Sequence, residues 1–141
     1  MGSKLLDKIT LNHIEKINVK GGDVYKLLRK DFSNKVKFGE LYLSAIEKNY
    51  IKGWKKHFKM TLNLFVIEGC VKFVFYDEYV NKFFTKTLTK SFNYSLTVPP
   101  GIWFGFKGLK YKKNIIMNFA NLPHDDNEVI SKKISQIKYN W

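Results

Sequence analysis

The feature that most constrains the fold is a succession of short runs rich in aromatic and β-branched residues, each closed by a turn signal. Such residues favour a pleated sheet over a helix. Many short strands with turns between them are typical of a β-sandwich or barrel. We therefore predict an all-β domain with strands at His13–Lys20, Asp23–Arg29, Gly39–Ile46, Met60–Ile67, Val71–Tyr76, Phe83–Leu88, Ser95–Val98, Ile102–Phe106 and Asn114–Phe119.

The run at residues 72–76 alternates clearly between two kinds of side chain. Side chains alternate between the two faces of a strand. Phe73 and Phe75 should therefore point to one face, and Lys72, Val74 and Tyr76 to the other. This pattern predicts a strand with two different faces.

Length and composition fit one compact domain with a substantial core. The chain has 141 residues, of which 45% are apolar and 16% aromatic, so disorder is not expected. We predict a single domain over residues 1–141, with residues 1–10 flexible.

Cys70 is the only cysteine, which excludes an internal disulfide and favours a reducing compartment. No run is long enough to span a membrane, and the first residues lack a signal-peptide core. We therefore expect a cytoplasmic protein.

The formal net charge is +13, and 25 residues are basic. The resulting positive potential attracts phosphate-bearing partners. Nucleic acid, an anionic membrane and a nucleotide-sugar diphosphate are all compatible with it. Arg29 is the only arginine, although bidentate phosphate sites favour that residue. The charge is equally compatible with a lysine-rich proteome.

Cationic and aromatic side chains alternate in the segment 51–63. In an extended conformation, Lys55, His57 and Lys59 share one face, and the other carries Trp54 and Phe58. Cations inside a barrel are costly unless an anion or water meets them. This face therefore meets a ligand phosphate or a sugar keto oxygen, or it is solvated and the aromatic face is core.

The segment 98–107 places aromatic residues directly after a Pro99-Pro100-Gly101 turn. Pro fixes such a turn and Gly relieves it. Trp103 and Phe104 are then either core residues or the wall of a pocket that stacks on a base or sugar ring.

The segment 118–128 groups His124 with three carboxylates. Metal binding by His124, Asp125 and Glu128 is conceivable, but the spacing is not diagnostic. The simpler interpretation is a turn followed by a short helix over residues 127–135, capped by Asn127.

Together, the three segments resemble the cupin superfamily, and within it the dTDP-4-dehydrorhamnose 3,5-epimerase-like and sugar 3,4-ketoisomerase-like proteins. The resemblance is carried by Ile51-Lys52-Gly53-Trp54-Lys55-x-His57-x-x-Met60-Thr61-Leu62-Asn63, Gly69, Val98-Pro99-Pro100-Gly101-x-Trp103, Phe106-Lys107, His124-Asp125-x-Asn127-Glu128 and Tyr139-x-Trp141. It implies a cupin-type jelly-roll β-barrel, here with a short C-terminal helix, that forms a homodimer.

The chain departs from the metal-binding cupins at three of four ligand positions. Those proteins carry a His-x-His pair, a downstream Glu and a later His. Here Lys55 replaces the first His, Thr61 or Leu62 stands at the Glu, and Phe104 replaces the later His. Only His57 remains, and one ligand does not hold a divalent metal. We therefore expect no metal and no other cofactor.

The resemblance also implies catalytic roles. Lys55 takes the place of the base of the 3,5-epimerases, and His57 matches the base of the 3,4-ketoisomerases. Both reactions remove a proton α to a ketone and pass through an enediolate. We predict that His57 is the base and that Lys55 stabilises the oxyanion. The residues predicted to bind substrate are Lys52, Lys59, Asn63, Arg29, Trp103, Phe104, Asn118 and His124.

The function predicted from these residues is epimerisation or isomerisation of a keto-deoxysugar nucleotide, for surface polysaccharide biosynthesis. The main alternative is a non-catalytic cupin that binds a sugar nucleotide or carbohydrate. A barrel that binds nucleic acid through charge and aromatic residues ranks lowest, because no basic stripe is interleaved with aromatics. We therefore predict a nucleotide-diphosphate sugar as the partner, and neither nucleic acid nor membrane.

Overall fold

The computed structural model describes residues 2–29, 37–110 and 112–141. The regular elements of the described chain are strands and short 3₁₀ helices, joined by turns and loops. In chain order they are η1 (Leu6–Lys8), β1 (Thr10–His13), β2 (Glu15–Ile17), β3 (Val24–Lys26), β4 (Glu40–Glu47), β5 (Ile51–His57), β6 (Leu62–Glu68), β7 (Cys70–Asp77), β8 (Lys82–Thr89), β9 (Tyr94–Val98), β10 (Trp103–Gly108), β11 (Lys113–Ala120), η3 (Asp126–Glu128), β12 (Val129–Ser131) and η4 (Ile134–Gln136).

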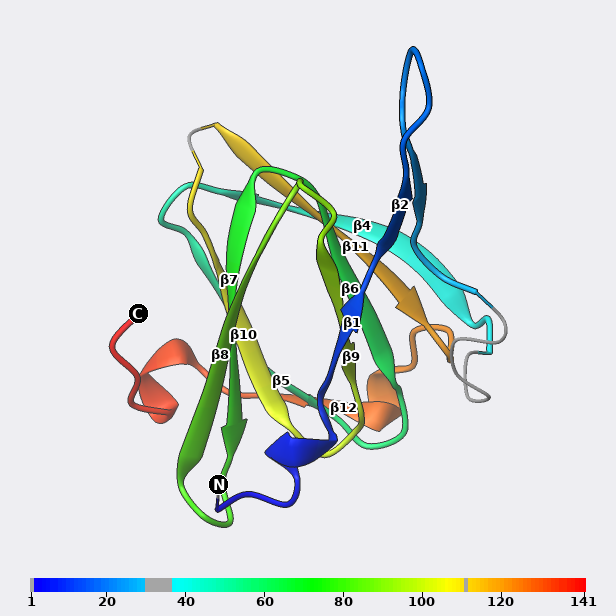
Figure 1. Cartoon of the computed structure of the whole chain (residues 1–141). Helices are drawn as coiled ribbons and strands as arrows, with labels where there is room; N and C mark the ends of the chain where they lie inside the picture. The colour runs from blue at the N-terminus through cyan, green and yellow to red at the C-terminus, as the bar shows by residue number, and fades with distance from the viewer. Residues whose placement is uncertain (1, 30–36, 111) are drawn as a thin grey trace.

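Two five-stranded antiparallel sheets pack face to face (Figure 1). The first sheet has the order β1-β9-β6-β11-β4, and the second has the order β12-β5-β10-β7-β8. Strands β2 and β3 form a separate hairpin that projects from the body of the barrel. Non-consecutive neighbours in both sheets are the mark of a jelly roll. The prediction of an all-β cupin-type barrel is confirmed.

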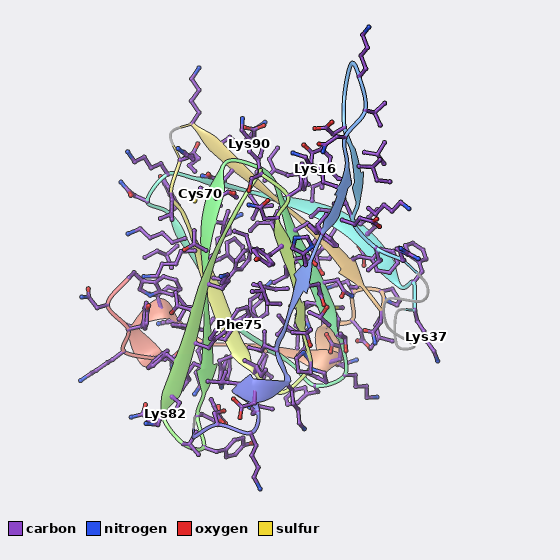
Figure 2. All side chains as sticks on the ribbon, in the orientation of Figure 1. Lys16, Lys37, Cys70, Phe75, Lys82 and Lys90 are labelled. Atoms are coloured by element: carbon purple, nitrogen blue, oxygen red, sulfur yellow. The ribbon has the colours of Figure 1, made fainter. Side chains whose placement is uncertain are left out.

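The core lies between the two sheets, and the alternation in β7 sets its composition. Phe73 and Phe75 are fully buried there, together with apolar residues of β6, β9 and β11. Figure 2 shows Phe75 in the interior of the barrel, whereas Lys82 and Lys90 lie at its periphery. Val74 and Tyr76 belong to a second apolar cluster. The two faces predicted for this strand are confirmed.

The predicted helix over residues 127–135 is wrong. Asp126–Glu128 and Ile134–Gln136 form single 3₁₀ turns, and the strand Val129–Ser131 lies between them. Asp125, not Asn127, caps the first turn, because its side chain accepts a hydrogen bond from the backbone N–H of Asn127. The strand forms because it pairs with β5, which would otherwise be a bare sheet edge.

The N-terminal residues pack against the end of the second sheet. The Ser3 hydroxyl is buried and donates a hydrogen bond to Asp77 at 2.7 Å. Leu6 belongs to the core cluster between the sheets. These contacts tie the N-terminal residues to β7 and to the core.

Candidate functional site

A cavity of about 670 Å³ lies between the two sheets. Its polar lining comes from β4, β5, β11 and the segment after β11: Glu40, Tyr42, Ser44, Lys52, Lys55, His57, Asn118 and His124. Its apolar lining comes from Met60, Leu62, Leu64, Phe73, Phe104, Phe106, Ile116 and Val129. A mostly apolar cavity with a few convergent polar groups is the usual form of a small-molecule site.

His57 is the buried imidazole of this cavity. Its side chain is only 10% exposed, and its ring stacks on the Phe104 ring with the centroids 5.9 Å apart. Phe104 and neighbouring apolar walls limit access of water to the imidazole. Because a histidine exchanges protons near neutral pH, this position suits acid–base chemistry.

Glu128 lies behind His57 and hydrogen-bonds to the imidazole Nδ1. Its other carboxylate oxygen accepts from the backbone N–H groups of Lys59 and Met60, at 3.2 and 3.1 Å. Burial raises the pKa of Glu128. The hydrogen bonds from His57, Lys59 and Met60 and the charge of His57 outweigh that effect and leave the pKa below its ordinary value. The site therefore pairs an imidazole with a buried, ionised carboxylate.

A hydrogen-bonded chain of polar side chains holds Tyr42 on the opposite wall. The Tyr42 hydroxyl oxygen accepts from the Asn118 side-chain amide at 2.9 Å. The Asn118 carbonyl oxygen in turn accepts from the backbone N–H of Asn63 at 3.2 Å. Since Asn118 fills an acceptor position of Tyr42, the phenolic hydrogen can be donated to a ligand.

Lys52 and Lys55 give one side of the cavity a positive charge. Both lie on β5, and both are exposed to solvent where they line the cavity. The Lys52 ammonium group donates to the Ala45 carbonyl of β4 at 2.7 Å. The remaining donors of these two groups can meet an anionic ligand.

Of the residues predicted from the sequence, the cavity brings together six: His57, Lys55, Lys52, Phe104, Asn118 and His124. Four others lie elsewhere among the described residues. Lys59 lies beyond the end of β5. The side chains of Leu62, Leu64 and Phe104 line the cavity. Since side chains alternate along a strand, those of Asn63 and Trp103 point away from the cavity.

Arg29 lies far from the predicted site. It pairs with Glu15 at 3.5 Å and lines a second cavity of about 410 Å³. That cavity also contacts Leu41 and Met117. Because Leu41 alternates with Glu40 and Tyr42, this second cavity is on the outer face of the first sheet.

The side chains at the cupin metal position do not fit a metal. Lys55, Leu62 and Phe104 surround His57 in the cavity, and none of the three is a metal ligand of the cupin type. No three His, Cys, Asp or Glu side chains of residues 2–29, 37–110 and 112–141 converge on a metal-sized site. Among the described residues, Glu128 is the carboxylate that contacts His57, and its two oxygens already bond to the imidazole and to the backbone N–H groups of Lys59 and Met60.

Sequence reasoning missed the polar lining residues of β4, which are Glu40, Tyr42 and Ser44, and it missed the contact of Glu128 with His57. Glu40 and Tyr42 alternate with leucines on β4, so they share one polar face of the strand. That alternation is the sequence signal that could have identified them as lining residues. From the sequence, Glu128 is either a metal ligand with His124 and Asp125 or part of a helix start. Its contact with His57 joins positions 71 residues apart, and no local signal reports such a contact.

No protein-family model matches the sequence, and no curated protein matches it. Solved structures do. A dTDP sugar isomerase from Desulfovibrio desulfuricans G20 is 27% identical over 96% of this chain and 91% of that chain, with a TM-score of 0.85.

Two more distant structures share the fold. The sugar 3,4-ketoisomerase QdtA from Thermoanaerobacterium thermosaccharolyticum, in complex with TDP, is 17% identical over 94% of this chain and 93% of that chain, with a TM-score of 0.79. A dTDP-4-dehydrorhamnose 3,5-epimerase from Bacillus anthracis str. Ames, with TDP and PPi bound, is 16% identical over 99% and 87%, with a TM-score of 0.85. The suspected similarity to these two kinds of protein is confirmed.

Proposed function

We propose that this chain is an epimerase or isomerase of a keto-deoxysugar nucleotide, and that it works without a metal. The observation that carries the proposal is the buried His57 imidazole, which lines an apolar cavity beside Lys55 and is held from behind by Glu128. The 27% identical dTDP sugar isomerase, which matches nearly the whole chain, supports the same reaction class.

In the proposed reaction, His57 removes the proton on the carbon next to the sugar ketone. The electron pair of that C–H bond moves to the ketone oxygen and forms an enediolate. The Lys55 ammonium group and the Tyr42 hydroxyl are the donors of the cavity that can stabilise the developing oxyanion. Return of the proton from His57⁺ to the former ketone carbon, together with transfer of the hydroxyl proton from the oxygen of the first carbon to the former ketone oxygen, gives the isomerised ketone. Return of the proton to the first carbon from the other face requires a different donor. A single buried base therefore favours ketoisomerisation over double epimerisation.

The rest of the cavity suits the other parts of such a substrate. Lys52 and His124 provide cationic or hydrogen-bonding groups for a diphosphate. Leu64, Phe106 and their apolar neighbours form a lining that accepts a deoxygenated sugar carbon. The formal net charge of +13 attracts an anionic substrate from a distance.

A non-catalytic sugar-nucleotide-binding protein is the second candidate. It is favoured by Lys55, which occupies the base position of the 3,5-epimerases. It is also favoured by β6, which carries no lysine, because in the 3,5-epimerases that the sequence resembles a lysine of the strand after the base assists it. Incubation of the wild-type protein with 4-keto deoxysugar nucleotides in deuterated water separates the two candidates. Deuterium at the carbon next to the ketone supports the enzyme. Saturable binding without any exchange overturns it and supports the binding protein.

The biological setting proposed is surface polysaccharide biosynthesis in the cytoplasm, with no nucleic-acid or membrane partner. In the part of the chain that the structure describes, no helix has the length and apolar character needed to cross a membrane.

We also propose a homodimer. Leu41 and Leu43 are about half exposed on the outer face of β4, and the β2–β3 hairpin projects beyond the barrel (Figure 1). Sedimentation of the purified protein as a monomer at micromolar concentration contradicts this assembly.

A further inference from the structure

A chain of polar residues crosses all five strands of the first sheet, in the strand order β1-β9-β6-β11-β4. Hydrogen bonds of 2.7–3.2 Å join each member to the next, three of them between side chains and one from a backbone N–H. The members are Asn12, Thr97, Asn63, Asn118 and Tyr42. The last two line the cavity. The chain therefore connects the far edge of the sheet to a hydroxyl of the candidate site.

The orientation of the Asn118 amide is fixed by its neighbour on β6. Asn118 is 3% exposed, and its side-chain oxygen accepts from the backbone N–H of Asn63 at 3.2 Å. A backbone N–H only donates. If the amide were turned over, its NH₂ group would face that N–H, and two buried donors would lose their acceptors, which is costly. The NH₂ group of Asn118 therefore points to Tyr42.

Asn63 is itself held from both sides. Its side-chain NH₂ group donates to the Phe119 carbonyl at 3.1 Å, and its side-chain oxygen accepts from the Thr97 hydroxyl at 2.7 Å. The Thr97 oxygen accepts in turn from the Asn12 amide at 2.8 Å. Because a carbonyl only accepts and an amide NH₂ only donates, each bond has one possible direction. These bonds hold the N–H that orients Asn118.

This arrangement decides where the hydrogen of the Tyr42 hydroxyl can lie. The Asn118 NH₂ group does not accept hydrogen bonds, so the hydroxyl cannot donate to it. The hydroxyl oxygen accepts instead, at 2.9 Å, and Asn118 is its hydrogen-bond partner among the described residues. A phenolic hydrogen stays near the plane of its ring, which leaves it two positions. Asn118 closes one of them, so the hydrogen takes the other, where a ligand can accept it.

We propose that Asn118 is a positioning residue, which fixes the Tyr42 hydroxyl as a hydrogen-bond donor to the ketone oxygen of the substrate. This inference rests on the proposed function, because the ketone belongs to that substrate. Tyr42 lies on β4 and Lys55 on β5, in opposite sheets, so the two donors approach the oxygen from different walls of the cavity. Asn118 acts through Tyr42 and needs no contact of its own with the substrate.

The variant Asn118→Asp separates this role from a purely structural one. Its carboxylate still accepts from the backbone N–H of Asn63, so the contact with β6 is kept. A carboxylate cannot donate, so the Tyr42 hydroxyl turns its hydrogen toward it and away from the ligand. The matched control is Asn121→Asp. The Asn121 side chain also accepts from a backbone N–H, that of Thr61 at 2.8 Å, but it is not part of the cavity lining.

A double-mutant cycle measures whether Asn118 acts through Tyr42. The rate of deuterium exchange is compared in the wild type, Asn118→Asp, Tyr42→Phe and the double variant. Asn118→Asp should lower kcat about 10–10²-fold, because it turns away one oxyanion donor. When Tyr42→Phe is already present, it should lower kcat by less than about twofold. Asn121→Asp should leave kcat unchanged. Equal losses with and without Tyr42→Phe overturn the positioning role, and so does an unchanged kcat in Asn118→Asp.

A spectroscopic measurement provides a second arm that needs no turnover. The probe is a TDP-linked 4-keto-6-deoxyhexose labelled with ¹³C at the ketone, bound to His57→Asn, which lacks the proposed base. A hydrogen bond to the ketone oxygen moves the resonance of this carbon downfield. Adding Asn118→Asp or Tyr42→Phe should each move it back upfield by the same amount, and adding Asn121→Asp should not move it.

The two arms distinguish a failure of the inference from a failure of the proposed function. A ketone resonance that is equal with and without Tyr42→Phe overturns the inference, whether or not Asn118→Asp folds. So does a resonance that does not change when the protein is added. If the wild type catalyses no exchange but the resonance responds to Tyr42→Phe and Asn118→Asp as expected, the enzymatic function fails and the positioning role stands.

Discussion

Lys55 and His57 lie on the same side of β5, and both side chains line the cavity between the sheets. Lys56, between them, points to the opposite face, where its ammonium group pairs with Glu78 at 3.2 Å. Strand alternation therefore separates two neighbouring lysines into different roles. The cationic group next to the imidazole is available to a ligand, and the other one is used in packing.

The variant His57→Asn should abolish most turnover without unfolding the protein. A positioned general base contributes about 10²–10⁴-fold to the rate, so we expect kcat to fall by that factor. Deuterium incorporation into a 4-keto deoxysugar nucleotide measures it, and circular dichroism reports the fold. His13→Asn is the matched control. His13, on β1, lies outside the cavity, and its ring packs edge-on against the ring of Tyr94 on β9. Full activity in His57→Asn excludes this residue as the base.

The variant Lys55→Met should slow the reaction while the protein stays folded. Removal of one oxyanion donor typically costs about 10²–10³-fold in kcat. Methionine keeps much of the side-chain volume, so the cavity wall is preserved. The control is Lys90→Met, since Lys90 is exposed and pairs only weakly with Glu68 at 3.5 Å. Equal kcat values for Lys55→Met and the wild type would show that the ammonium group does not act on the oxyanion.

Glu128 should make the stability of the fold depend on pH in the acid range. Because its pKa in the folded protein is below the ordinary value, its stabilising contribution is fully present above the unfolded pKa of about 4.5. It is lost as the pH falls through the folded pKa. Glu128→Gln should therefore be less stable than the wild type at pH 7, and the difference should shrink below about pH 4.5. Urea unfolding at pH 7, 5 and 3.5 measures both free energies. A constant difference over this range contradicts the assignment.

The sequence is sufficient to predict the strands whose alternation is strong. In β7, Phe73 and Phe75 lie on one face and Val74 and Tyr76 on the other, as expected from the period of two, and the structure shows that the phenylalanine face enters the core between the sheets. The same rule explains why Trp103 does not line the cavity. Trp103 and Phe104 are neighbours on β10 and cannot both face the cavity. Phe104 lines it, and Trp103 donates its indole N–H to Glu78 on the opposite face.

The C-terminal part of the site was beyond sequence reasoning because its structure is imposed by tertiary pairing. Residues 127–135 have a cap signal and no strong strand pattern, so local rules favoured a helix. The pairing of β12 with β5 overrides that preference. The partner of His57 is therefore a residue 71 positions away.

The last residue of the chain anchors this C-terminal part. The Trp141 ring packs against Trp54 and Tyr139, with centroid distances of 5.2 Å in both cases. Gly105 allows this approach, because a Cβ atom there would lie 3.0 Å from the Trp141 ring. A contact of that length forces the indole to move. Trp141 thus joins the end of the chain to β5 and β10.

The variant Trp141→Ala should destabilise the protein by about 2–3 kcal/mol, at or below the usual range for buried tryptophan, because the ring is only partly buried. Gly105→Ala should act in the same direction, since it displaces the same ring. Urea unfolding with intact tryptophans Trp54 and Trp103 as fluorescent probes measures both. Tyr79→Ala is the control, because Tyr79 is 78% exposed and should change stability by less than about 0.5 kcal/mol. If Trp141→Ala behaves like Tyr79→Ala, the C-terminal ring does not hold β12 against β5, and the position of Glu128 depends on backbone pairing alone.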